Sequence, residues 1–170
     1  MIIVQWPAML WALVPVIVVE SLLIRHWLSL SCANAFKGTS IANLVSTLVG
    51  VPIAWLIMFA LELGINGSHG SVKTNSPALD ALHFLAGIAW LTPNEKNIYW
   101  EVPTALALLL IPTFFISVWI ERFICRKWWK DLNVASVKRA VFKANLVSYA
   151  VLFAIACGLL IYNLLSKHVT

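Results

Sequence analysis

Apolar residues fall into four long runs along the chain, separated by polar stretches. The runs cover residues 5–27, 41–63, 102–124 and 142–165. A helix crosses a bilayer in about 20 mainly apolar residues, and these runs are continuously apolar rather than alternating, which excludes the strands of a membrane barrel. The pattern therefore predicts an all-α integral membrane protein with four transmembrane helices.

The central connection, residues 64–101, contains a fifth element that is shorter than the others. Ser76 and Pro77 provide an N-cap and a proline in the first helical turn, and an apolar stretch follows until Pro93. A helix over 77–91 would be about 22 Å long at about 1.5 Å per residue, too short to span the hydrocarbon. We expect this apolar helix to lie on the membrane, to re-enter it or to dock on a partner protein.

Composition supports one compact membrane domain over residues 1–170. The chain is 61% hydrophobic and 11% charged, and its mean hydropathy is +0.88. An ordinary soluble domain is roughly a quarter charged, and a chain this short has too large an exterior to hide so much apolar surface. The excess apolar side chains are therefore expected to face lipid or another membrane protein.

Two short segments occur twice, once in each half of the chain. The pentapeptide ANLVS stands at 42–46 and again at 144–148, and the segment VVESLLIR at 18–25 is matched by WIERFICR at 119–126. The glutamate and the asparagine are 23 residues apart in the first copy and 24 in the second, and a repeated element with so similar a spacing is the signature of a duplication. The sequence thus predicts two tandem helical hairpins, a first over about 5–63 and a second over about 102–165, with the same orientation in the membrane.

The repeated segments place polar side chains at one depth in the predicted bundle. A glutamate comes near the end of the first helix of each hairpin, and an asparagine and a serine begin the second helix. Ionisable groups in hydrocarbon cost at least ~2.5 kcal/mol each, so these side chains should turn inward. The predicted intramembrane polar cluster consists of Glu20, Asn43, Ser46, Glu121, Asn145 and Ser148.

Two interpretations of this polar cluster remain open. In the first, each asparagine bonds across helices and each glutamate pairs with an arginine or a hydroxyl, which fixes the packing of the helices. In the second, the carboxylates bind a cation, a proton or a polar substrate that moves through the bundle.

Basic residues are concentrated around two of the connections, and by the positive-inside rule this predicts the orientation. We expect loops 28–40 and 125–141 to be cytoplasmic and both termini to lie outside, in a cytoplasmic membrane such as the bacterial inner membrane. We then expect the basic residues behind the net charge of +5 to contact anionic lipid headgroups rather than nucleic acid. Predicted contacts to headgroups or to a partner are Arg25, Arg122, Arg126, Lys127, Trp128, Trp129, Lys130, Lys138 and Arg139.

No motif for hydrolytic, nucleotide or haem chemistry is present, so we predict no catalytic residue, no metal and no cofactor. The leading hypothesis is a non-catalytic subunit or scaffold of a larger membrane assembly, with the external helix at 77–91 as a candidate contact to other subunits. The alternative is a small transporter or channel that uses Glu20 and Glu121, and the third is a membrane enzyme acting on lipid or quinone.

Overall fold

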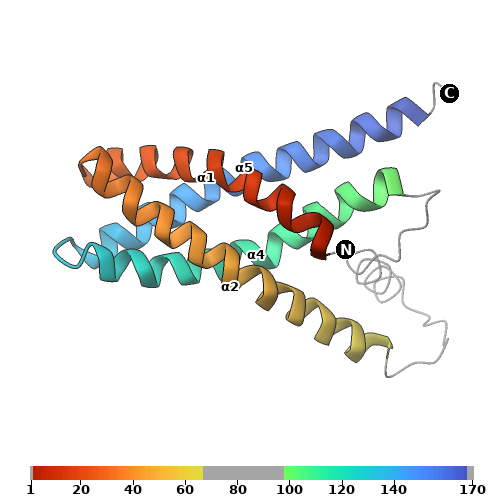
Figure 1. The fold of residues 1–170 in the computed structure, drawn as a ribbon, viewed down its shortest axis with the longest axis horizontal. Helices are drawn as coiled ribbons and strands as arrows, with labels where there is room; N and C mark the ends of the chain where they lie inside the picture. The colour runs from red at the N-terminus through yellow and green to blue at the C-terminus, as the bar shows by residue number, and fades with distance from the viewer. Residues whose placement is uncertain (1, 67–97, 168–170) are drawn as a thin grey trace.

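The computed structural model describes residues 2–66 and 98–167, and these form four helices (Figure 1). They are α1 (Ile2–Leu28), α2 (Cys32–Asn66), α4 (Ile98–Trp128) and α5 (Val134–Lys167). Each predicted apolar run lies inside one of these helices, so the all-helical architecture is confirmed. The predicted external helix at 77–91 lies outside the described residues.

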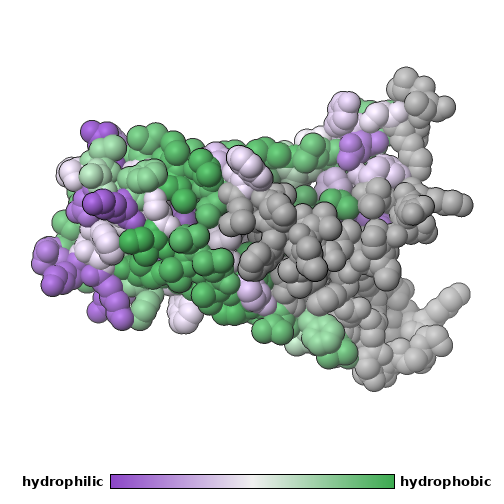
Figure 2. All heavy atoms as spheres, in the orientation of Figure 1, coloured by the Kyte–Doolittle hydropathy of each residue, from purple (hydrophilic) through white to green (hydrophobic). Residues whose placement is uncertain are grey.

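Three of the helices contain a stretch that is long and apolar enough to cross a membrane. These stretches are Trp11–Leu28, Tyr99–Trp128 and Val134–Ser166. Their outer surfaces carry large apolar side chains, such as Trp11 and Trp119, which are 80% and 72% exposed. Apolar residues cover the flank of the molecule in Figure 2. A surface of this kind is unfavourable in water and indicates insertion into a membrane.

The four helices pack as a closed ring of neighbours. Among the described residues, α1 and α4 each pack against both α2 and α5, whereas α1 and α4 lie on one diagonal of the ring and α2 and α5 on the other. The two short connections lie together at one end, on the left in Figure 1, which we call the connection end. From there α2 and α5 diverge toward the opposite end.

The first connection is a tight turn built by local backbone chemistry. Ser29 has a positive φ of 51°, and the amide of Leu30 donates to the carbonyl of Arg25 at 3.2 Å. This is the bond of a Schellman motif, which ends a helix by satisfying its free carbonyls. The next helix begins at once, because the Ser31 hydroxyl accepts a bond from the amide of Asn34 at 3.4 Å.

The second connection uses an asparagine in the same capping role. The side-chain oxygen of Asn133 accepts bonds from the amides of Ala135 and Ser136 at 2.9 and 3.2 Å. These are two of the amides that a helix N-terminus leaves without an internal partner. Helix α5 therefore begins immediately after Asn133.

Both connections are much shorter than the expected loops at 28–40 and 125–141. Helix α2 begins at residue 32 and α5 at residue 134, each well before the apolar run it contains. These first turns are amphipathic rather than continuously apolar, and hydropathy alone does not detect them. Their inner faces are buried in the bundle at Ala35, Thr39, Val137 and Val141.

Tryptophan side chains pack tightly over α2 at the connection end. Trp129 is buried, and the indole nitrogens of Trp128 and Trp129 donate to the side-chain oxygen of Asn34 at 3.1 and 3.4 Å. A Cβ placed on Gly38 would lie 2.6 Å from the Trp129 ring and 2.9 Å from the Trp128 ring. Only glycine fits here, so Gly38 allows α4 to end against α2.

We predict that Gly38→Ala destabilises the purified protein. The added methyl group would collide with two indole rings that are held by Asn34, and overpacking of this kind costs about 1–3 kcal/mol. Gly158→Ala is the matched control, because nothing lies within 4 Å of the added Cβ, and alanine favours a helix by about 1 kcal/mol over glycine. Thermal unfolding in detergent should separate the two variants. Equal stability of both would contradict the close contact at Gly38.

Candidate functional site

The candidate site is centred on two buried glutamates, one on each helix of a diagonal pair. Glu20 lies on α1 and is 0% exposed. Its Oε2 accepts a hydrogen bond from Nδ2 of Asn43 on α2 at 2.7 Å, and its Oε1 accepts one from the hydroxyl of Ser148 on α5 at 2.5 Å. Glu20 is thus bound by both helices that flank α1.

Glu121 on α4 has the same kind of surroundings. It is 2% exposed, its Oε2 accepts a bond from Nδ2 of Asn145 on α5 at 2.6 Å, and its Oε1 accepts one from the hydroxyl of Ser46 on α2 at 2.9 Å. Each glutamate therefore has one amide donor and one hydroxyl donor, taken from its two neighbouring helices.

The donors are positioned by helix geometry. On α2 and on α5 the asparagine and the serine are three residues apart, so they share one face. Each asparagine Nδ2 also donates to a backbone carbonyl in the preceding turn, Asn43 to Thr39 and Asn145 to Val141, both at 3.2 Å. Because an amide nitrogen carries two hydrogens, the second bond directs the first toward the carboxylate.

The four bonds form a closed circuit around the bundle. Each of the four pairs of neighbouring helices, α1 with α2, α2 with α4, α4 with α5 and α5 with α1, is joined by one bond between side chains. All six residues of the predicted polar cluster belong to this circuit. Asn145 retains one further acceptor, because its Oδ1 is buried without a hydrogen-bond partner.

The neighbouring arginines point away from the glutamates. Arg25 is exposed. The guanidinium of Arg122 lies 5.1 Å from the ring centroid of Phe142, and its Nε donates to the backbone carbonyl of Lys138 at 3.3 Å. The partners of the carboxyl groups are thus amides and hydroxyls, not arginines.

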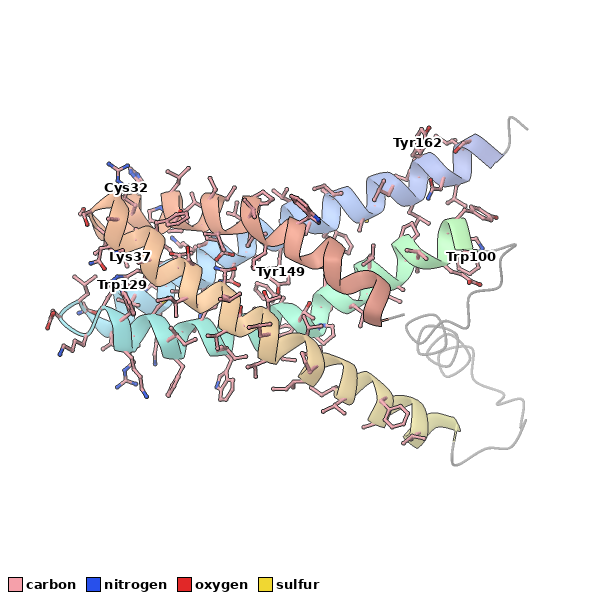
Figure 3. The ribbon with its side chains drawn as sticks, viewed as in Figure 1. Cys32, Lys37, Trp100, Trp129, Tyr149 and Tyr162 are labelled. Carbon is pink, nitrogen blue, oxygen red and sulfur yellow. The ribbon has the colours of Figure 1, made fainter. Side chains whose placement is uncertain are left out.

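Layers of side chains close the circuit above and below. On the connection side lies an apolar cluster that includes Ile24, Cys125 and Trp129. On the other side the hydroxyls of Ser117 and Tyr149 bond to each other at 2.8 Å, and Tyr149 lies in the interior of the bundle (Figure 3). The glutamates are therefore enclosed on both sides.

Three contributors near this site are not predicted by the sequence pattern: Asn34, Gly38 and the Ser117–Tyr149 pair. The Ser117–Tyr149 bond joins residues 32 positions apart, outside any local pattern. A glycine four residues before a repeated segment and a serine within an apolar run are weak signals by themselves, and the role of each depends on how α4 packs.

Most residues of the predicted headgroup set lie on the outer surface near the connection end. Figure 2 shows hydrophilic side chains gathered there. Trp129 differs, because it is only 4% exposed and packs in the apolar cluster. The exposed members are Arg25, Arg126, Lys127, Trp128, Lys130, Lys138 and Arg139, and Arg122 is partly exposed.

The chemistry available at the site is that of carboxyl oxygens held by neutral donors. Such an arrangement can lock helices together and can hold a proton. Among the described residues there is no group of three or more His, Cys, Asp or Glu side chains that could hold a metal ion. No protein-family model, curated protein or solved structure matches the chain.

We predict that Asn43→Ala and Asn145→Ala each destabilise the bundle by about 1–3 kcal/mol, because each leaves a buried carboxyl oxygen without its donor. Asn163→Ala is the control: it removes a bond of 2.8 Å between α5 and the backbone carbonyl of Tyr99 on α4, and membrane bonds of this kind average only about 0.6 kcal/mol. Unfolding by denaturing detergent from lipid bicelles would measure the three losses. Equal losses of stability in the three variants would show that the circuit contributes no more than the Asn163 bond.

Proposed function

We propose that the protein is a non-catalytic integral subunit or scaffold of a larger membrane protein assembly. The observation that carries the proposal is an outward-facing row of small residues on α5. Ala150, Ala154 and Gly158 follow one another at four-residue steps, and all three are exposed. Small residues at such spacing let helices approach closely in membranes, where tight packing drives association.

The comparable small residues on α2 are already used inside the chain. Gly50 and Ala54 are buried, and a Cβ on Gly50 would lie 3.2 Å from Ile116 of α4. By contrast, nothing lies within 4 Å of a Cβ on Gly158. One small-residue face thus packs against the chain itself, whereas the other is left for a partner helix.

An apolar groove beside this row supports the same proposal. It lies between α4 and α5, has a volume of about 300 Å³, and is lined by Leu110, Ile111, Phe114, Phe115, Leu146, Tyr149, Ala150 and Phe153. The one hydroxyl among these residues, that of Tyr149, is bonded to Ser117. The groove therefore offers aromatic and aliphatic surface to a transmembrane helix that packs against Ala150.

The hydrogen-bond circuit supports a structural rather than a catalytic use of the glutamates. All four carboxyl oxygens are engaged by donors from neighbouring helices. A rigid, saturated core of this kind fits a protein whose task is to present a fixed outer surface to other subunits.

The same proposal includes four spans arranged as two copies of one hairpin. Helix α2 has 35 residues, about 52 Å at about 1.5 Å per residue, more than a bilayer requires. The hydrogen bonds of the two halves match one for one, with each glutamate bound by the asparagine of its own hairpin and the serine of the other. In this arrangement the connection end, with its basic residues, faces the cytoplasm, where Arg126, Lys127 and Lys130 contact anionic headgroups.

Labelling of the native cysteines tests the orientation. Cys32 is exposed at the connection end, whereas Cys125 is buried. We expect a membrane-impermeant maleimide to label the protein in inside-out vesicles and not in intact cells. The label should disappear in Cys32→Ser and persist in Cys157→Ser. Labelling of Cys32 from outside intact cells would refute the proposed orientation.

Bulky substitution on α5 tests the proposed assembly. Ala154→Leu should abolish recovery of the partner subunits when the protein is extracted from native membranes in mild detergent, because leucine blocks the close approach of a helix. Ala60→Leu makes the same change at an exposed position of α2 and should leave recovery unchanged. A wild-type chain that always purifies alone, or partners that remain bound to the Ala154→Leu variant, would contradict the proposal.

A further inference from the structure

The two glutamates that lock the helices also interact with each other. Glu20 and Glu121 are both buried on diagonal helices of the ring, and both are bound by side chains that lie one turn apart on α2 and on α5, so their carboxyl groups share one layer of the bundle interior. An ionised carboxylate only accepts hydrogen bonds, so a bond between two carboxyl groups requires a hydrogen on one of them. We propose that Glu20 and Glu121 form a proton-binding site that holds one shared proton.

The charge balance around the pair supports this proposal. The hydrogen-bond partners of both carboxyl groups among the described residues are amides and hydroxyls, and none of them is a basic side chain. The titratable side chains that do interact with both carboxyl groups are Cys125 on α4 and Tyr149 on α5. A thiol and a phenol carry no positive charge in any protonation state. Helix α2 contacts the carboxyl groups through Asn43 and Ser46, whose side chains do not titrate.

The basic side chains that adjoin the cluster in sequence on α4 and α5 stack on aromatic rings. The guanidinium of Arg122 lies over Phe142, and the ammonium of Lys143 lies 5.9 Å from the ring centroid of Trp27. Two negative charges in one buried layer, with no counter-ion bonded to them among the residues that the structure describes, repel each other strongly. One proton removes that repulsion and converts it into an attraction, as in other carboxyl pairs that share a site.

The count of hydrogens in the circuit points the same way. The protein supplies four donors, and the four carboxyl oxygens take all of them. The Oδ1 of Asn145 is a fifth oxygen of the cluster; it is fully buried and has no partner. None of these four donors can form a bond between the two carboxyl groups, so the hydrogen of that bond has to come from the solvent.

A proton fits this site better than a metal ion. Calcium and magnesium take six or more oxygen ligands, whereas four of the five oxygens here each accept a hydrogen from an amide or a hydroxyl. A proton needs only two oxygens, and the two carboxyl groups provide them. The bond formed is O–H on one glutamate, with the other glutamate as acceptor, and the proton comes from the solvent.

Infrared spectroscopy of the full-length protein in phosphatidylcholine vesicles tests the proposal. A protonated carboxyl group has a carbonyl stretch that is distinct from the carboxylate bands and shifts in deuterium oxide. At neutral pH we expect a band equivalent to one acid group per chain, and we expect it to disappear at alkaline pH. This measurement on the wild-type protein does not depend on the folding of any variant.

Glutamine variants test whether the protonated carboxyl band comes from Glu20 and Glu121. Glu20→Gln and Glu121→Gln should each remove it completely, because the new amide supplies the hydrogen that the shared proton supplied. Glu101→Gln is the control, since the Oε2 of Glu101 is also buried without a partner; it should leave the band unchanged.

Four results would overturn the proposal. The first is that the wild-type protein has no protonated band, and the second is that the band survives in both glutamine variants. The third is a band equivalent to two acid groups, of which each variant loses half. The fourth is a band that changes when sodium is replaced by choline. The last would identify a metal cation as a competing ligand of the same oxygens.

Discussion

The structure depends on four hydrogen bonds that join two buried glutamates to the helices beside them. Because α1 and α4 are diagonal in the ring, each carboxyl group must be bound by α2 on one side and α5 on the other, and the four bonds together join every neighbouring pair. A membrane gives helices little hydrophobic reason to associate with each other. A buried polar circuit supplies direction as well as energy, because a helix that rotated or shifted would leave a carboxyl group without its donor.

The packing around the circuit keeps water out, so a carboxyl group that lost its donor could not bond to water instead. On the connection side, Trp129 closes the bundle by lying against Gly38, and both indole nitrogens at the end of α4 are held by Asn34. On the opposite side, the hydroxyls of Ser117 and Tyr149 bond to each other. Unpaired polar groups cost most where water is excluded. The apolar and aromatic layers therefore strengthen the selection of one helix arrangement.

Much of the site could be predicted from the sequence, because the repeated Glu, Asn and Ser positions share one depth. Which serine binds which glutamate could not be predicted. The Ser46–Glu121 and Ser148–Glu20 bonds join residues 75 and 128 positions apart, and they depend on the order of helices around the ring. The starts of α2 and α5 were also missed, because Ser31 and Asn133 extend these helices into segments that are polar on one side.

The two halves of the chain differ in where their small residues lie. In the alignment set by the ANLVS pentapeptides, Gly50 of α2 corresponds to Leu152 of α5. Gly50 admits Ile116 of α4 to close contact, whereas a leucine keeps its neighbour farther away. The small residues of α5 stand instead on the outward side, at Ala154 and Gly158. Under the proposed duplication, the polar circuit kept its symmetry because the Ser46–Glu121 and Ser148–Glu20 bonds join each half to the other. The small-residue faces have no such bond between them, so under the same proposal they could diverge, one toward the chain and the other toward a partner.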